Sequence, residues 1–246
     1  MASASISDFF DSSVEPKVRG YLHVPETPNG SGLILTHGAG GNAQAPLLRA
    51  LADTFSAAGV TVFRCDLPYR QTRSFGPPGP ADAARDRAGL MNAVVVLRTI
   101  LGAPLLAEVA RSGDFARNQE KEKANIFLGG HSYGGRQSSM LCAEEPELVS
   151  GLLLLSYPLH PPRRPEQQRT QHLPDLHTPT LFVHGSRDPF GTTEELERAL
   201  KMIPARTKLI TVDGAGHDLG FKGKSKKEEL PGRIFSEFST FLAVSS

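Results

Sequence analysis

One short stretch constrains the fold of this chain more than any other, the segment from Asn125 to Gly135. An apolar, strand-like run ends in two glycines, Ser132 follows shortly after, and two more glycines lead into a segment of helical composition. The pattern Gly-x-Ser-x-Gly is weak by itself, because any glycine-rich turn can contain a serine. Between a buried strand and a helix it predicts a sharp, strained turn that lifts the serine hydroxyl above the carboxyl edge of a sheet. Gly130 and Gly134 are expected to be glycines because side chains there would clash where strand and helix approach closely.

The rest of the chain alternates between apolar runs and amphipathic segments. The runs are predicted to be strands, most of them covered on both faces, at Gly32–Thr36, Val60–Cys65, Gly151–Ser156, Thr180–His184 and Thr207–Val212. In the segments between them, leucine and phenylalanine recur at spacings near three and four, which predicts helices. This alternation predicts an α/β fold with an open, mostly parallel central sheet and helices on both faces.

The length of 246 residues suits one well-buried domain, and no linker rich in glycine and serine divides the chain. We therefore expect a single domain over residues 1–246. Residues 1–16 are expected to be a loose end or an edge strand, and residues 25–31 a hairpin turn after an outer strand. Residues 157–178 are predicted to form an irregular loop over the rim of the sheet, too long for a simple connection and therefore functional.

Charge and cysteine content narrow the function classes. The chain has 27 Lys and Arg residues and 26 Asp and Glu residues. The resulting net charge of +1 is too small to attract nucleic acid or an acidic membrane electrostatically. The basic segment 222–227 is expected to be a solvated loop, and residues 102–123 are left without a prediction. Cys65 and Cys142 lack the spacing of metal ligands and are expected to be buried thiols.

The sequence predicts no cofactor, no metal ion, no secretion signal and no membrane-spanning segment. No phosphate-binding, dinucleotide-binding or metal-binding motif is found, so we expect no cofactor and no metal ion. The start of the chain lacks the features of a secretion signal, and no apolar run reaches membrane-spanning length. We expect a cytoplasmic protein with a small-molecule partner, and leave the oligomeric state open.

Three predicted strand ends carry side chains suited to nucleophilic chemistry, Ser132, Asp188 and His217. Because the carboxyl ends of parallel strands share one rim, these residues are expected to meet there. A serine hydroxyl is too weak an acid to attack a carbonyl unaided, so the histidine would take its proton and the aspartate would orient the imidazole. The backbone N–H groups of Tyr133 and Ala39 are expected to form an oxyanion hole.

Each of the three side chains also has a plainer interpretation, as a turn serine, a capping aspartate and a surface histidine. Their positions after buried strands, in this order, favour the chemical role over the plainer one. Tyr69, Arg70 and His160 are placed on loops expected near the mouth of the site, where they would contact the substrate. The alternative for these loop residues is that they are simply solvated.

The order serine, acid, histidine is that of the α/β-hydrolases, which the chain resembles over most of its length. The segments His37–Gly40, Tyr157–Pro162, His184–Gly191 and Gly216–His217 are similar to the dienelactone-hydrolase-related branch. Within it they most resemble a group with a testis-expressed hydrolase-like protein and the hydrolase-like domain of a chromatin regulatory subunit. The resemblance implies the α/β-hydrolase fold and the three catalytic positions, but not a substrate. Dienelactone hydrolases use cysteine where this chain has Ser132, which argues against that particular activity.

The leading hypothesis is a metal-free serine hydrolase that cleaves a small carboxylic ester or related acyl bond through an acyl-enzyme. No full cap domain is expected, so loops 71–80 and 157–178 would shape a pocket for compact substrates. Thioesterase and peptidase activities use the same chemistry and remain open. The alternative is a non-catalytic binding or scaffold subunit with a hydrolase fold, although a scaffold has no need of all three side chains.

Overall fold

The computed structural model describes residues 4–102, 125–221 and 229–243. The segment 102–123, apart from its first residue, and the basic segment 222–227 lie outside these ranges. In the described part of the chain, eight strands form one sheet in the order β1-β2-β4-β3-β5-β6-β7-β8. The strands are β1 (Ser5–Asp11), β2 (Val18–Val24), β3 (Gly32–Thr36), β4 (Thr61–Cys65), β5 (Ile126–His131), β6 (Gly151–Leu155), β7 (Thr180–Gly185) and β8 (Thr207–Val212).

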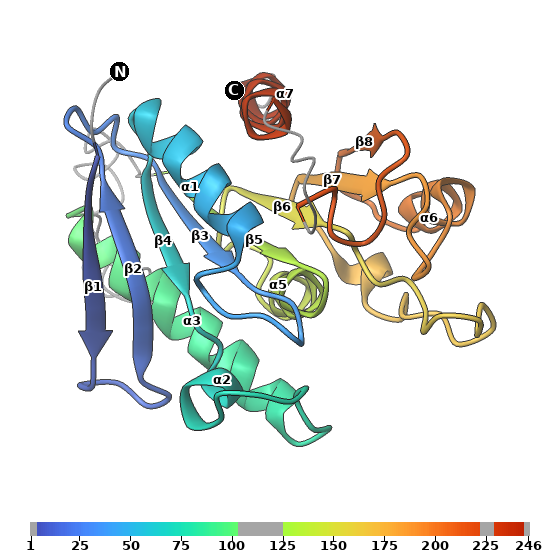
Figure 1. Ribbon diagram of the computed structural model, residues 1–246, viewed down its shortest axis with the longest axis horizontal. Coiled ribbons are helices and arrows are strands. Elements are labelled where there is room, and N and C mark those ends of the chain that lie inside the picture. The colour runs from blue at the N-terminus through green and yellow to red at the C-terminus, as the bar shows by residue number, and fades with distance from the viewer. Residues whose placement is uncertain (1–3, 103–124, 222–228, 244–246) are drawn as a thin grey trace, which may run out of the picture.

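The sheet has an antiparallel edge and a parallel body, as Figure 1 shows. Strand β2 pairs antiparallel with β1 and with β4, whereas all pairs from β4 to β8 are parallel. Every residue of β3, β4 and β6 is buried, because these strands have neighbours on both sides and helices on both faces. The predicted α/β architecture with a mostly parallel sheet is confirmed.

The predicted hairpin turn at residues 25–31 is wrong. The hairpin is formed by β1 and β2, with Asp11 opposite Val18, and residues 25–31 instead carry the chain across to β3. Strand β2 has exposed and half-buried positions, which suits a place near the edge. Strand β3 is fully buried and apolar up to its last residue, Thr36, so it gains more by lying inside the sheet, between β4 and β5.

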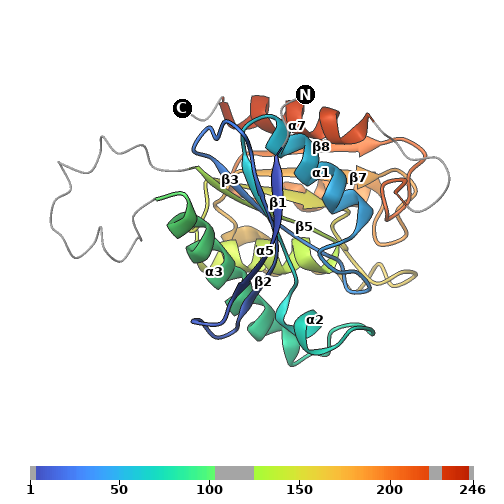
Figure 2. The ribbon, with the colours of Figure 1, turned by 60° about the vertical axis from the view of Figure 1, so that its left-hand side comes forward.

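Helices cover both faces of the sheet (Figure 2). On one face lie α1 (Pro46–Ala57) and α7 (Leu230–Ala243), and on the other lie α3 (Asp82–Ile100), α5 (Tyr133–Glu144) and α6 (Thr193–Leu200). The short α2 (Pro68–Thr72), which the sequence analysis did not predict, follows β4 directly. None of the helices in the described ranges combines the length and apolar character needed to cross a bilayer.

The parallel arrangement brings several loops to one edge of the sheet. Strands β3, β5 and β7 end just before His37, Ser132 and Asp188, and His217 follows the end of β8. Loop 157–178, irregular as predicted except for a single 3₁₀ turn (Leu173–Asp175), leaves from the end of β6 at the same edge. Residues distant in the sequence therefore meet where these strands end.

Candidate active site

Ser132 lies on a strained turn between β5 and α5. Its backbone has φ 52° and ψ −116°, a left-handed conformation that non-glycine residues rarely adopt. The turn is held in place because the N–H of Ser132 donates to the carbonyl of Leu155 on β6 at 2.8 Å, and its carbonyl accepts from Arg136 at 2.9 Å. The predicted sharp turn between a buried strand and a helix is confirmed.

The glycines around this turn are required by close backbone contacts. A Cβ on Gly130 would lie 2.6 Å from the backbone nitrogen of Gly135, and one on Gly134 would lie 2.5 Å from the carbonyl oxygen of His37. The contact at Gly130 is between the incoming strand and the outgoing helix, so the steric reason expected for this glycine is confirmed. The contact at Gly134 is instead between the helix and the end of β3, so this glycine is needed for a different close approach.

Three side chains form a continuous chain of hydrogen bonds at the sheet edge. The hydroxyl Oγ of Ser132 lies 2.7 Å from Nε2 of His217. On the other side of the same ring, Nδ1 lies 2.8 Å and 3.0 Å from the two carboxylate oxygens of Asp188. The acceptor is a carboxylate, so Nδ1 carries the proton and Nε2 accepts from the serine hydroxyl. The structure thus brings together the three residues that the sequence analysis selected.

The imidazole of His217 is positioned by further contacts. The ring of Phe190 lies over it, with centroids 4.2 Å apart, and Nε2 of His131 donates to its backbone carbonyl at 2.7 Å. Asp188 is held in turn by the backbone N–H of Phe190, which donates to Oδ1 at 2.9 Å. The carboxylate of Asp188 is fully buried, whereas the side chain of His217 is 22% exposed and is therefore accessible to a substrate. Phe190 had no sequence signal beyond its place two residues after Asp188.

The loop after β3 is fixed by side chains that bind its carbonyl groups. The hydroxyl of Tyr69 donates to the carbonyl of Ala39 at 2.9 Å, and Arg70 donates to the same carbonyl at 3.0 Å and to that of Gly41 at 2.8 Å. His37 donates through Nδ1 to the carbonyl of Gly38 at 2.9 Å, and its burial lowers its pKa, so the ring is neutral. These three side chains hold the loop in place through its carbonyl groups.

Two of the expected substrate contacts are therefore corrected. Tyr69 and Arg70 are 1% and 5% exposed, and their polar atoms are occupied by loop carbonyls rather than directed to the mouth of the site. The sequence placed them correctly beside the end of β4. It did not reveal that the unpredicted helix α2 turns both side chains inward.

The third expected substrate contact, His160, is also buried in the protein. Its ring lies 3.2 Å from a carboxylate oxygen of Glu195 on α6 and 2.8 Å from the carbonyl of Pro161. Only 5% of the residue is exposed. His160 therefore fastens loop 157–178 to the start of α6 instead of facing a substrate.

Asp86 connects the site to helix α3 and was missed by the sequence analysis. Its carboxylate accepts from the hydroxyl of Tyr133 at 2.8 Å and from the backbone N–H of Tyr69 at 3.0 Å. The residue is completely buried, and burial raises its pKa. The sequence could have indicated the importance of Asp86, because this acidic residue lies four positions before Leu90 and therefore on the apolar face of the predicted helix.

Two cavities meet at Ser132. One, of about 280 Å³, extends under α1 and is mainly apolar, with Pro46, Leu47 and Phe221 in its wall. The other, of about 500 Å³, lies beneath residues 77–80 and loop 157–178. A substrate with its carbonyl at the serine therefore has space on both sides.

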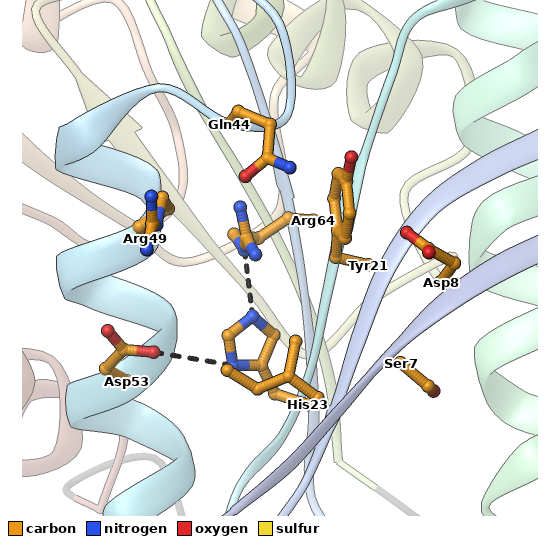
Figure 3. A pocket seen from close by; sticks show the side chains of 9 residues that line it. Ser7, Asp8, Tyr21, His23, Gln44, Arg49, Asp53 and Arg64 are labelled. Atoms are coloured by element: carbon orange, nitrogen blue, oxygen red, sulfur yellow. Dashed lines mark hydrogen bonds and ion pairs between the residues drawn. The ribbon is translucent and has the colours of Figure 1, made fainter.

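A third cavity, of about 380 Å³, lies away from Ser132 between β1, β2 and α1 (Figure 3). It contains another histidine beside a carboxylate, His23, whose Nδ1 lies 3.6 Å from Asp53. Here Nε2 accepts from the guanidinium of Arg64 at 2.8 Å, as Figure 3 shows. Burial and the nearby Arg64 lower the pKa of His23 to about 4, so the ring is neutral at pH 7.

Comparison with known proteins agrees with this architecture. A family model described as "Alpha/beta hydrolase domain" matches residues 29–241. A dienelactone hydrolase from Anabaena variabilis is similar in structure, with a TM-score of 0.69 and 22% identity over 97% of this chain and 98% of that chain. An α/β serine hydrolase without a lid from Xanthomonas campestris has a TM-score of 0.66 and 15% identity over 97% and 95%. An α/β serine hydrolase homologue from Coxiella burnetii has a TM-score of 0.65 and 14% identity over 98% and 97%.

Proposed function

The chain belongs to the α/β-hydrolase family, and on that premise we propose that it is a serine hydrolase that cleaves a small carboxylic ester through an acyl-enzyme. The observation that carries the proposal is the hydrogen-bonded chain from Ser132 through His217 to Asp188. We assign these residues the roles of nucleophile, general base and orienting acid. The finer placement in the dienelactone-hydrolase-related branch rests on the sequence motifs and remains a prediction.

In the first half of the reaction, Oγ of Ser132 attacks the ester carbonyl carbon while its proton passes to Nε2 of His217. The buried carboxylate of Asp188 stabilises the imidazolium that forms and keeps its orientation. The tetrahedral intermediate then collapses, and His217 gives the proton to the departing alcohol. In the second half, His217 deprotonates a water molecule that attacks the acyl carbon, and it then returns this proton to Oγ of Ser132 as the acyl–oxygen bond breaks and the carboxylic acid leaves.

The negative oxygen of the intermediate is assigned to two backbone N–H groups. That of Tyr133 is at the first position of α5 and has no partner within the helix. That of Ala39 shares a trans peptide with the carbonyl of Gly38, which accepts from His37 and from Tyr69. Because the N–H and C=O of a trans peptide point in opposite directions, fixing this carbonyl also fixes the direction of the N–H of Ala39.

Phosphonate labelling and ester hydrolysis test the proposal together. The full-length protein is expected to react with a fluorophosphonate probe at Ser132 and to hydrolyse 4-nitrophenyl acetate and butyrate. The Ser132→Ala variant is the matched control and should lose both labelling and hydrolysis while keeping its circular dichroism spectrum. Equal hydrolysis by the two proteins, or a correctly folded wild type that neither reacts nor hydrolyses, would contradict the proposal. The second result would favour the alternative of a non-catalytic hydrolase-fold subunit, and a panel of thioesters and peptides would separate the related activities.

A further inference from the structure

Two arginines line the larger of the cavities that meet at Ser132, and neither takes part in the chemistry proposed above. Arg136 lies on α5, one helical turn beyond Ser132, and Arg169 lies in loop 157–178. Both contribute to the wall of the cavity of about 500 Å³, together with Ser132 itself. The space beside the serine is therefore bounded by two arginines from separate elements.

Within the described ranges, neither of these two arginines has an ion pair with a carboxylate, whereas Arg19, Arg73, Arg85 and Arg87 each have one. Burial and repulsion from Arg136 lower the pKa of Arg169. Two like charges facing one cavity are unfavourable unless an anion lies between them.

Arg169 is held by hydrogen bonds within its loop, and the buried Nε of Arg136 has no hydrogen-bond partner among the described residues. Arg169 donates through Nη1 to the carbonyl of Pro158 at 3.2 Å, and its own carbonyl accepts from the buried hydroxyl of Tyr157 at 2.7 Å. Next to Arg136, the fully buried Gln137 also lines the cavity, and its Nε2 has no hydrogen-bond partner in the described part of the chain. Two arginines beside one cavity, together with buried donors that have no partner, are the kind of arrangement that binds a carboxylate.

We propose that this cavity binds a carboxylate of the substrate, so that the enzyme prefers esters that carry an anionic group over their neutral counterparts. This inference rests on the proposed function, because it places the anion beside the same serine. The two guanidinium groups would bind the carboxylate, while the apolar cavity under α1 would accept the uncharged part of the substrate.

The position of Arg136 indicates the length of the substrate. Arg136 lies four positions after Ser132, a rise of about 6 Å along the axis of α5 at about 1.5 Å per residue. A substrate that reaches both residues would need only a short carbon chain between its reacting carbonyl and its carboxylate. Monoesters of adipate, a six-carbon diacid, are therefore suitable probes.

Matched pairs of anionic and neutral esters test the preference. For the acyl side the pair is mono-4-nitrophenyl adipate and methyl 4-nitrophenyl adipate, and for the alcohol side it is 3-acetoxybenzoate and methyl 3-acetoxybenzoate. We expect kcat/KM to favour the anionic member of one pair by about 10- to 100-fold. The pair that shows the preference identifies the side of the ester on which the carboxylate lies.

Variants of the two arginines connect this preference to the cavity. Arg136→Gln and Arg169→Gln are each expected to lower the anionic-to-neutral ratio by about 10-fold, and Arg169→Lys by less. Arg164→Gln is the matched control, because Arg164 is an exposed arginine of the same loop and does not line the cavity. Its ratio should equal that of the wild type. The circular dichroism spectrum of each variant checks its folding, and Arg169→Gln alone suffices if Arg136→Gln does not fold.

Binding to the Ser132→Ala variant makes the test independent of turnover. Monomethyl adipate is expected to bind this protein in isothermal titration calorimetry, and an added Arg169→Gln substitution should weaken binding about 10-fold. Ester hydrolysis without an anionic preference in either pair would overturn this inference and leave the proposed function intact. Absence of hydrolysis with binding that depends on Arg169 would overturn the proposed function but support the anion site. A ratio that is the same in wild type, Arg136→Gln and Arg169→Gln would also overturn the inference.

Discussion

Two histidines in this protein lie beside a carboxylate, yet their surroundings give them opposite chemistry. At the sheet edge, Nδ1 of His217 is bonded to Asp188, and Nε2 faces the hydroxyl of Ser132. Between β2 and α1, Nε2 of His23 is occupied by the guanidinium of Arg64, and Asp53 is 3.6 Å from Nδ1. The first ring has a base nitrogen directed at a nucleophile, and the second has that nitrogen blocked by a permanent cation.

The comparison shows that a histidine next to an acid is not by itself a catalytic pair. His217 has a buried carboxylate that can stabilise a charged ring and an exposed side from which substrate can enter. His23 is 1% exposed, whereas the side chain of its neighbour Asp53 is 62% exposed and lies largely in solvent. What decides the role is the partner of the second nitrogen and the burial of the acid.

The largest expected difference between the two clusters comes from removing each ring. His217→Gln should lower kcat for 4-nitrophenyl butyrate by about 10⁴- to 10⁶-fold, because the serine loses its base. His23→Gln should change kcat by less than about twofold when both are measured well below the unfolding temperature. Steady-state kinetics on the folded proteins distinguish the two. Comparable losses from both substitutions would show that the two clusters do not differ as described.

Neutralising each carboxylate should give the next largest contrast. Asp188→Asn is expected to lower kcat about 10⁴-fold, because an amide favours the wrong tautomer of His217. Asp53→Asn, the matched control, should leave kcat within about twofold of wild type. The measurement is kcat at saturating ester for each purified variant, and a small effect at Asp188 would remove that residue from the proposed chemistry.

The His23 cluster should instead appear in the pH dependence of stability. The folded-state pKa of His23 is lowered from 6.5 to about 4, so between these values the unfolded chain binds a proton that the folded protein does not. Its contribution to stability is present above pH 6.5 and is lost as the pH falls toward 4, by at most about 3 kcal/mol. His172, whose pKa is also lowered to about 4, adds in the same direction.

Urea unfolding at a series of pH values measures this effect. Wild type should lose stability steadily from pH 6.5 to pH 4, and His23→Gln should lose less over the same interval because one of the two histidines no longer titrates. Identical slopes for the two proteins would mean that His23 takes up its proton at the same pH in the folded and unfolded states, which contradicts its burial beside Arg64.

A smaller decrease in kcat is expected when the hydroxyl that holds the loop after β3 is removed. Tyr69→Phe removes the hydroxyl that binds the carbonyls of Gly38 and Ala39, so the N–H of Ala39 becomes less well fixed. We expect about a 10-fold lower kcat with a smaller change in KM. Tyr21→Phe, at a tyrosine that lines the cavity of His23, is the matched control and should have kcat within about twofold of wild type. Equal kcat for the two variants would argue that the loop does not depend on this hydroxyl.

The sequence predicted correctly those strands and turns that are specified by the residues within them. The bounds predicted for β3 and β8 agree with those in the structure, and Gly130 has the close contact with the helix that was expected. Helix α2 was missed because five residues carry too little periodicity to be recognised. The hairpin at residues 25–31 was wrong because turn composition does not specify which strands pair across the turn.

The amino-acid sequence alone determined the α/β architecture, the strained turn at Ser132 and the selection of Asp188 and His217. These follow from the runs of apolar residues, the spacing of the glycines and the order of the strand ends. Each of these features depends only on neighbouring residues or on the order of residues along the chain. Tertiary structure alone decided that Tyr69 and Arg70 hold a loop and that Arg136 and Arg169 face the cavity. The physical reason is that the direction of a side chain and its partners depend on which elements pack together, and arginines with different roles look alike in a sequence.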